Sequence, residues 1–190
     1  MAGVSLVLGV GILTGLATQI GQGFMPGQWN TLVNSGAIWL VAVFLVASRM
    51  PTPVSAAAAA TGGLLSTVAT YYGAAALTGA PISLRNVLFW AVVGLVAGPL
   101  FGLAGYWRYD ERRMLRVAGV ALLGGVLVAE GFYLLLVLKY YWSGWAMVLA
   151  GILAATLLAQ QTDRLRTLAA LPLPALAAGV AYAVIYWLTI

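Results

Sequence analysis

Long apolar runs, interrupted by short polar segments, make up almost the whole chain. A membrane-spanning helix needs about 20 mostly apolar residues. Windows of about this length recur along the sequence: Val4 to Gly23, Thr31 to Ser48, Val54 to Thr78, Val87 to Trp107, Met114 to Leu138, Trp142 to Gln160 and Leu168 to Thr189. The pattern therefore predicts an all-α polytopic membrane protein, in which residues 1–190 form one domain, a bundle of seven transmembrane helices.

The last window leaves an alternative count of six. Pro172 and Pro174 stand near its start, and proline can neither donate a backbone hydrogen bond nor continue a helix without distortion. We expect either a kinked helix there or a short interfacial helix before a shorter span.

Composition excludes a soluble fold and several chemistries. The chain is 63% hydrophobic and 7% charged, whereas soluble domains carry about a quarter charged residues. It contains no Cys and no His, which removes thiolate nucleophiles, Ser-His dyads and the usual zinc and haem ligands. We therefore expect the lipid bilayer as the surroundings, no cofactor, no metal, no nucleic-acid partner and no enzymatic activity.

The basic residues predict an orientation. Alternate connections between the windows hold seven of the nine basic residues, namely Arg49, Arg108, Arg112, Arg113, Arg116, Arg164 and Arg166, and the other connections hold Arg85 and Lys139. Because cytoplasmic loops are enriched in Lys and Arg, the N-terminus is predicted to be cytoplasmic. Three of the four carboxylates, Asp110, Glu111 and Asp163, are expected in these connecting loops.

The fourth carboxylate, Glu130, lies inside the apolar run from Val117 to Leu138. An ionisable group at membrane depth costs at least a few kcal/mol, and so indicates a proton site, an ion pair or a ligand contact. The structural alternative is that Glu130 only accepts hydrogen bonds from Asn34, a Tyr hydroxyl or water, and so holds helices together.

The predicted topology collects polar and aromatic residues in the outer half of the membrane. We expect a pocket there, lined by Asn34, Tyr71, Tyr72, Trp90, Glu130 and Tyr133. Aromatic faces with one carboxylate suit a cationic or nitrogen-rich heterocyclic solute. The pattern favours a protein that binds or transports a small molecule, and the alternative is a membrane scaffold or accessory protein.

Small residues predict where helices approach closely. Gly94, Gly98 and Gly102 repeat at four-residue spacing, as do Gly11 and Gly15. Such spacing lets helix backbones come into contact. The small-residue tract from Ala56 to Ala60 offers a smooth surface to a neighbouring helix of this chain or of a partner.

Two resemblances extend this interpretation. Asn34-Ser35 with Trp39, Tyr71-Tyr72, Phe89-Trp90, Gly98-Pro99-Leu100-Phe101-Gly102 and Ala129-Glu130-Gly131 together resemble a family of small, functionally uncharacterised bacterial membrane proteins common in actinobacteria. Size and the Gly-Pro motif are loosely similar to the S-components of energy-coupling-factor vitamin transporters. The resemblances imply a bacterial cytoplasmic membrane, a solute in the outer half and a transporter coupling subunit as partner.

Overall fold

The computed structural model describes the backbone of residues 2–189 and the side chains of residues 6–184. All regular elements in this range are helices. The chain divides into two compact units, Met1–Tyr106 and Trp107–Ile190, which are called unit 1 and unit 2.

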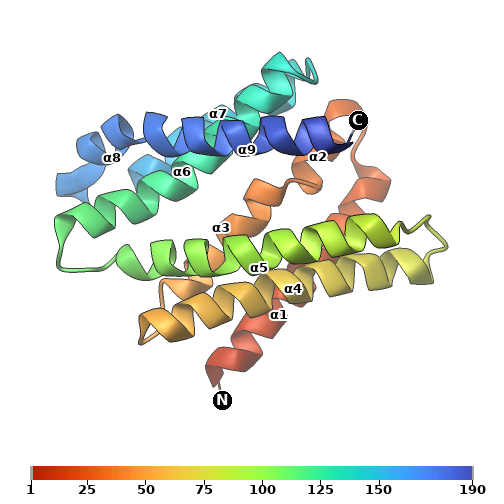
Figure 1. The fold of residues 1–190 in the computed structure, drawn as a ribbon, viewed down its shortest axis with the longest axis horizontal. Helices are drawn as coiled ribbons and strands as arrows, with labels where there is room; N and C mark the ends of the chain where they lie inside the picture. Colours follow the sequence, from red (N-terminus) through yellow and green to blue (C-terminus); the bar gives the residue numbers. More distant parts are fainter. Residues whose placement is uncertain (1, 190) are drawn as a thin grey trace. The chain divides into compact units, whose positions relative to one another are not determined.

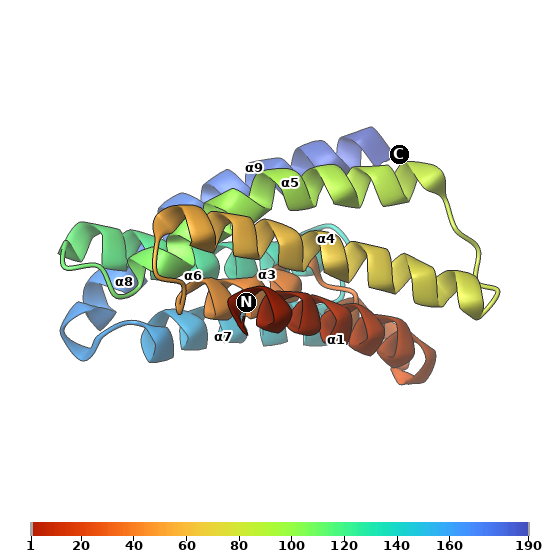
Figure 2. The same cartoon turned by 90° about the horizontal axis from the view of Figure 1, so that it is seen from below.

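Unit 1 contains three long helices and one broken segment (Figure 1). Its elements are α1 (Ala2–Phe24), η1 (Gly27–Trp29), α2 (Asn30–Val33), α3 (Gly36–Ala47), α4 (Pro53–Leu77) and α5 (Leu84–Trp107). Helix α4 begins with a capping box, in which Thr52 and Ser55 each accept from the backbone N–H of the other. Figures 1 and 2 both show α4 lying between α1 and α5.

Glycines bring both neighbours into contact with α4. A Cβ added at Gly11 of α1 would lie 2.5 Å from the carbonyl oxygen of Gly63, and one at Gly98 of α5 would lie 2.5 Å from the Cα of Thr61. At Gly102 the nearest atom would be the carbonyl oxygen of Ala56, also at 2.5 Å. The predicted close packing is confirmed, and Ala56 and Ala57 of the small-residue tract of α4 contact Gly102 within this chain.

The second predicted span is interrupted. Helix α2 ends at Val33, and Asn34 leaves the helical region with φ −98° and ψ 26°. Ser35 then caps α3, because its Oγ accepts from the backbone N–H of Ile38 at 3.1 Å. The predicted second span agrees with the candidate span Gly27–Ala47, but it is not one continuous helix, because the Ser35 hydroxyl caps a new helix after Asn34.

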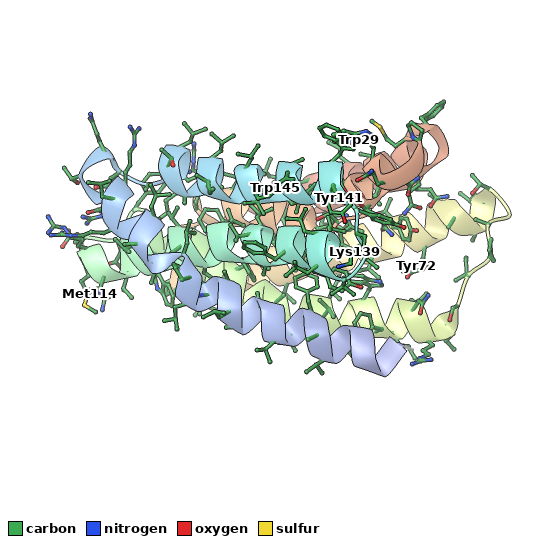
Figure 3. All side chains as sticks on the ribbon, turned by 90° about the horizontal axis from the view of Figure 1, so that it is seen from above. Trp29, Tyr72, Met114, Lys139, Tyr141 and Trp145 are labelled. Carbon is green, nitrogen blue, oxygen red and sulfur yellow. The ribbon has the colours of Figure 1, made fainter. Side chains whose placement is uncertain are left out.

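Unit 2 is built around α6 (Arg113–Leu136). It packs against α7 (Tyr141–Leu158) and α9 (Pro172–Thr189), and the short elements η2 (Gln161–Asp163) and α8 (Arg164–Ala170) connect these two. Fourteen residues of α6 are buried, including every residue from Val126 to Gly131. In Figure 3 Met114 lies at one end of this unit, and Lys139 and Tyr141 lie at the other.

Helices α6 and α7 meet at two pairs of glycines that our sequence analysis missed. A Cβ added at Gly151 would lie 2.6 Å from the carbonyl oxygen of Gly124, and one at Gly131 would lie 2.8 Å from that of Gly144. Each helix carries its two glycines seven residues apart. A seven-residue spacing also places both glycines on one helix face, but it differs from the four-residue spacing by which the sequence predicts close contacts.

The predicted count of seven spans is not confirmed. Among the described residues, five segments are long and apolar enough to cross a membrane: Leu6–Phe24, Gly27–Ala47, Leu84–Trp107, Arg113–Leu136 and Tyr141–Leu158. Gln161–Ala170 and Pro172–Val184, bent by 44°, form a sixth if the pair is one span. The bend stands at Pro172, where the sequence predicts it. Helix α4 has 25 residues but is not among these five segments.

Candidate functional site

A pocket of about 330 Å³ lies in unit 1 and is called the aromatic pocket. It lies where the break between α2 and α3, the C-terminal end of α4, the N-terminal end of α5 and the turn between them come together. Its lining consists of Asn34, Trp39, Tyr71, Tyr72, Pro81, Ile82, Ser83, Asn86 and Trp90.

Four aromatic rings form a continuous series in this pocket. The ring centroids of Trp90 and Trp39 are 5.5 Å apart, those of Trp39 and Tyr71 are 6.2 Å apart, and those of Tyr71 and Tyr72 are 4.8 Å apart in an edge-to-face arrangement. These separations lie in the range that favours aromatic pairs. The Trp90 ring also approaches Gly36, where an added Cβ would lie 3.2 Å from it.

Hydrogen bonds to α1 fix two of the rings. Trp39 Nε1 donates to Thr18 Oγ1 at 3.0 Å in a buried contact, and the Tyr71 hydroxyl donates to Gln22 Oε1 at 3.0 Å. In turn the backbone oxygen of Gln22 accepts from Asn30 Nδ2 at 2.8 Å. These contacts set the ring orientations without a bound molecule.

Other polar groups of the lining have no such partner. Among the described residues, no side-chain hydrogen bond reaches Asn34, Tyr72, Ser83 or Asn86. Their amide and hydroxyl groups are therefore free to contact a molecule in the pocket.

The six residues predicted for one pocket fall into two clusters. Asn34, Tyr71, Tyr72 and Trp90 all line the aromatic pocket, whereas Glu130 and Tyr133 belong to unit 2. The sequence analysis missed the contribution of Ser83 and the turn before α5. Gly79 with φ 72° and Pro81 mark that turn in the sequence, but nothing in the sequence places it beside the break in the second span.

Glu130 joins two helices of unit 2. Its side chain is buried, with 6% of the residue exposed, and the Tyr182 hydroxyl of α9 donates to Glu130 Oε2 at 2.7 Å. Tyr182 also stacks on Tyr133 of α6, with ring centroids 5.5 Å apart and planes at 21°. The carboxylate therefore accepts from a Tyr hydroxyl, as the structural alternative for this residue supposes.

An apolar groove of about 940 Å³ runs beside this cluster in unit 2. Apart from the two Tyr residues its side chains are hydrocarbon. The lining residues are Val128, Ala129, Phe132, Tyr133, Leu136, Val137, Val148, Ile152, Leu168, Leu171, Pro172, Ala175, Leu176, Gly179, Val180, Tyr182 and Ala183.

The surroundings of Asp163 differ from those expected for a carboxylate in a connecting loop. It lies in the connection between α7 and α8, as predicted, but it is 1% exposed and not solvated as a loop carboxylate would be. Arg116 Nε donates to its Oδ2 at 2.9 Å, and Arg113 Nε lies 3.3 Å from its Oδ1. The three-residue spacing of Arg113 and Arg116 places both on one helix face, which is the signal that could have indicated a shared acidic partner.

The loop before α6 carries a local ion pair. Arg112 donates from Nε to Asp110 Oδ1 at 3.1 Å and from its backbone N–H to the same oxygen at 2.8 Å. These hydrogen bonds lower the pKa of Asp110 below its ordinary value, and the bond from the Arg112 side chain makes the largest contribution. The Asp110 carboxylate is consequently ionised at neutral pH.

One family model matches the chain over residues 1–189, and its description is a family of unknown function, DUF6518. No curated protein and no solved structure matches. The match agrees with the expected membership of an uncharacterised family. The bacterial origin and the similarity to S-components remain predictions.

Proposed function

The chain belongs to the DUF6518 family. We propose that this multi-pass membrane protein binds a small, uncharged, ring-containing solute in the aromatic pocket of unit 1. Binding there serves recognition or transport of the solute. On the predicted orientation, the pocket faces the outer side of a bacterial cytoplasmic membrane.

The observation that carries this proposal is the pairing of fixed rings with unpartnered polar groups. Small-molecule sites combine a mostly apolar or aromatic wall with a few polar groups that orient the ligand. Trp39 and Tyr71 are held by hydrogen bonds, and Asn34 and Asn86 are not. The volume of about 330 Å³ lies at the lower end of about 300–1,000 Å³ for such sites.

The lining narrows the class of solute. Its nine residues include no Asp, Glu, Lys or Arg, so it offers no carboxylate to a cation and no basic group to an anion. The expectation of a cationic solute depended on Glu130, which lies in unit 2. Stacking faces with amide and hydroxyl groups suit a neutral heterocycle or a sugar ring, whose polar edge can take these hydrogen bonds.

The second candidate is a non-catalytic scaffold or accessory protein, and the Tyr182–Glu130 hydrogen bond favours it. In this case Glu130 serves only to fix α9 against α6. A transporter component should copurify with a trapped solute or a coupling subunit, and a scaffold should bring another membrane protein and no small molecule.

Native mass spectrometry of gently extracted protein tests the proposal. We expect an adduct of small mass on the wild type, and thermal stabilisation by neutral heterocycles or monosaccharides but not by choline. Asn86→Ala removes a solvent-exposed amide without an internal partner, so folding should be kept while affinity falls about two- to tenfold, the effect of one neutral hydrogen bond.

Two Tyr variants provide the matched comparison. Tyr72→Phe should weaken binding, and Tyr109→Phe, at an exposed Tyr outside the pocket, should not. If both Asn86→Ala and Tyr72→Phe bound the solute as the wild type does, the aromatic pocket would not be the binding site. Thermal stabilisation of the wild type by choline alone would also contradict the proposal.

A further inference from the structure

The apolar groove of unit 2 exposes an unusual amount of hydrocarbon on its walls. Phe132 is 45% exposed, Leu136 65%, Leu176 72% and Val180 65%. A Cβ added at Gly179, which lines the same groove, would meet no atom within 4 Å. The groove therefore has room for a slender apolar chain between α6 and α9.

A basic residue stands at one end of this groove. Arg164 and Leu168 lie four residues apart on α8 and so share a helix face, and Leu168 lines the groove together with Leu171, the residue that follows α8. Among the described residues Arg164 has no ion pair, whereas Arg113 and Arg116 both contact Asp163. An exposed, uncompensated cation thus lies next to the entrance of a hydrocarbon groove.

We propose that unit 2 binds one anionic phospholipid, with the phosphate at Arg164 and an acyl chain in the apolar groove. The wall that α9 provides runs from Pro172 to Ala183, a rise of about 16 Å at 1.5 Å per residue. This length matches the hydrocarbon depth of one leaflet, about 15 Å. The groove therefore accommodates the acyl chain of a lipid whose headgroup lies at the level of α8.

Charge selects this occupant over a second copy of the chain. The protein has a net charge of +5, so a copy docked at the same place would bring further positive charge towards Arg164, whereas an anionic headgroup neutralises it. A free phosphate lacks the acyl chain that the groove accommodates.

Native mass spectrometry of the full chain from nanodiscs tests the site. The probe is phosphatidylcholine containing one fifth phosphatidylglycerol by mole. Phosphatidylglycerol should be enriched among the lipids that remain bound. Arg164→Gln should reduce that enrichment about fivefold, the effect of one basic residue near an anionic surface. Arg166→Gln removes the same charge from another face of α8 and should change it less than twofold.

A second variant tests the groove itself. Gly179→Leu fills open space, so the melting temperature should stay near that of the wild type while bound lipid is lost. Gly73→Leu, at another glycine with no neighbour within 4 Å, should retain it.

Four results would overturn the proposal. The first is bound lipid with the same composition as the surrounding bilayer, and the second is an equal loss of phosphatidylglycerol enrichment in Arg164→Gln and Arg166→Gln. The third is displacement of the bound lipid by glycerol phosphate. The fourth is a dimer that forms in the wild type and is abolished by Gly179→Leu.

Discussion

At the scale of single residues, Glu130 shows how a carboxylate can exist inside an apolar helix. A buried charged group is costly unless a donor reaches it, and Tyr182 supplies a hydroxyl at 2.7 Å. Stacking on Tyr133 fixes the ring that carries this hydroxyl. The hydrogen bond from Tyr182 also joins α9 to α6, and the structural alternative for Glu130 predicts that this bond contributes to stability.

We therefore predict that Glu130→Ala and Glu130→Gln differ. Ala leaves the Tyr182 hydroxyl without its acceptor and should lower the free energy of unfolding by about 1–3 kcal/mol, whereas Gln keeps an acceptor and should stay near the wild type. Thermal melting in detergent measures both variants.

A double-mutant cycle with Tyr182→Phe provides the control for this prediction. Because the two side chains share one bond, their effects should not add. If Glu130→Gln instead weakened solute binding while melting stayed unchanged, the carboxylate would contact the solute and the structural role would be wrong.

At the scale of elements, glycine spacing decides which helices touch. In unit 1 the four-residue repeat on α5 contacts α4, and in unit 2 glycines seven residues apart join α6 to α7. At Gly98, Gly102 and Gly151 the nearest atom belongs to the backbone of the neighbouring helix, which cannot rotate away as a side chain can. Substitution at these glycines must therefore move a helix.

Gly98→Leu provides the test at this scale. The new side chain would meet the Cα of Thr61, where a Cβ already lies at 2.5 Å, and overpacking of this kind typically costs about 1–3 kcal/mol. Lower yield and a lower melting temperature should follow. The matched control is Gly62→Leu, at a glycine of α4 without a neighbour within 4 Å, and equal effects of both changes would contradict the packing described for α5.

At the scale of the whole molecule, the distribution of basic residues predicts which side of the membrane each connection faces. The chain has no natural Cys, so single introduced cysteines report position without background. Glu111→Cys, in the Arg-rich loop beside Arg112, should react with an impermeant maleimide only from the cytoplasmic side. Trp29→Cys, at a residue 42% exposed, should react only from outside.

Labelling of these two positions in spheroplasts and in inverted vesicles measures the orientation. The reverse pattern would place the aromatic pocket on the cytoplasmic side. It would also refute the outward-facing part of the proposed function, while leaving the pocket itself intact.

The sequence by itself determined the class of the protein. A chain that is 63% hydrophobic with long apolar runs can satisfy its backbone in a membrane only by forming helices, since closed β-barrels need an alternating pattern. It also indicated Asn34, Tyr71, Tyr72 and Trp90, because polar and aromatic residues at the ends of apolar runs are visible without knowing any contact.

Only the tertiary structure decided which of these residues meet. Residues far apart in sequence form the aromatic pocket, and its final lining depends on a helix break at Asn34 that a single Ser cap introduces. Burial of Asp163 between two arginines, and the hydroxyl that reaches Glu130 from α9, depend on how helices pack. Hydropathy describes one residue at a time. Which side chain contacts a residue about 50 positions away in the sequence is decided only when the helices pack together in the folded chain.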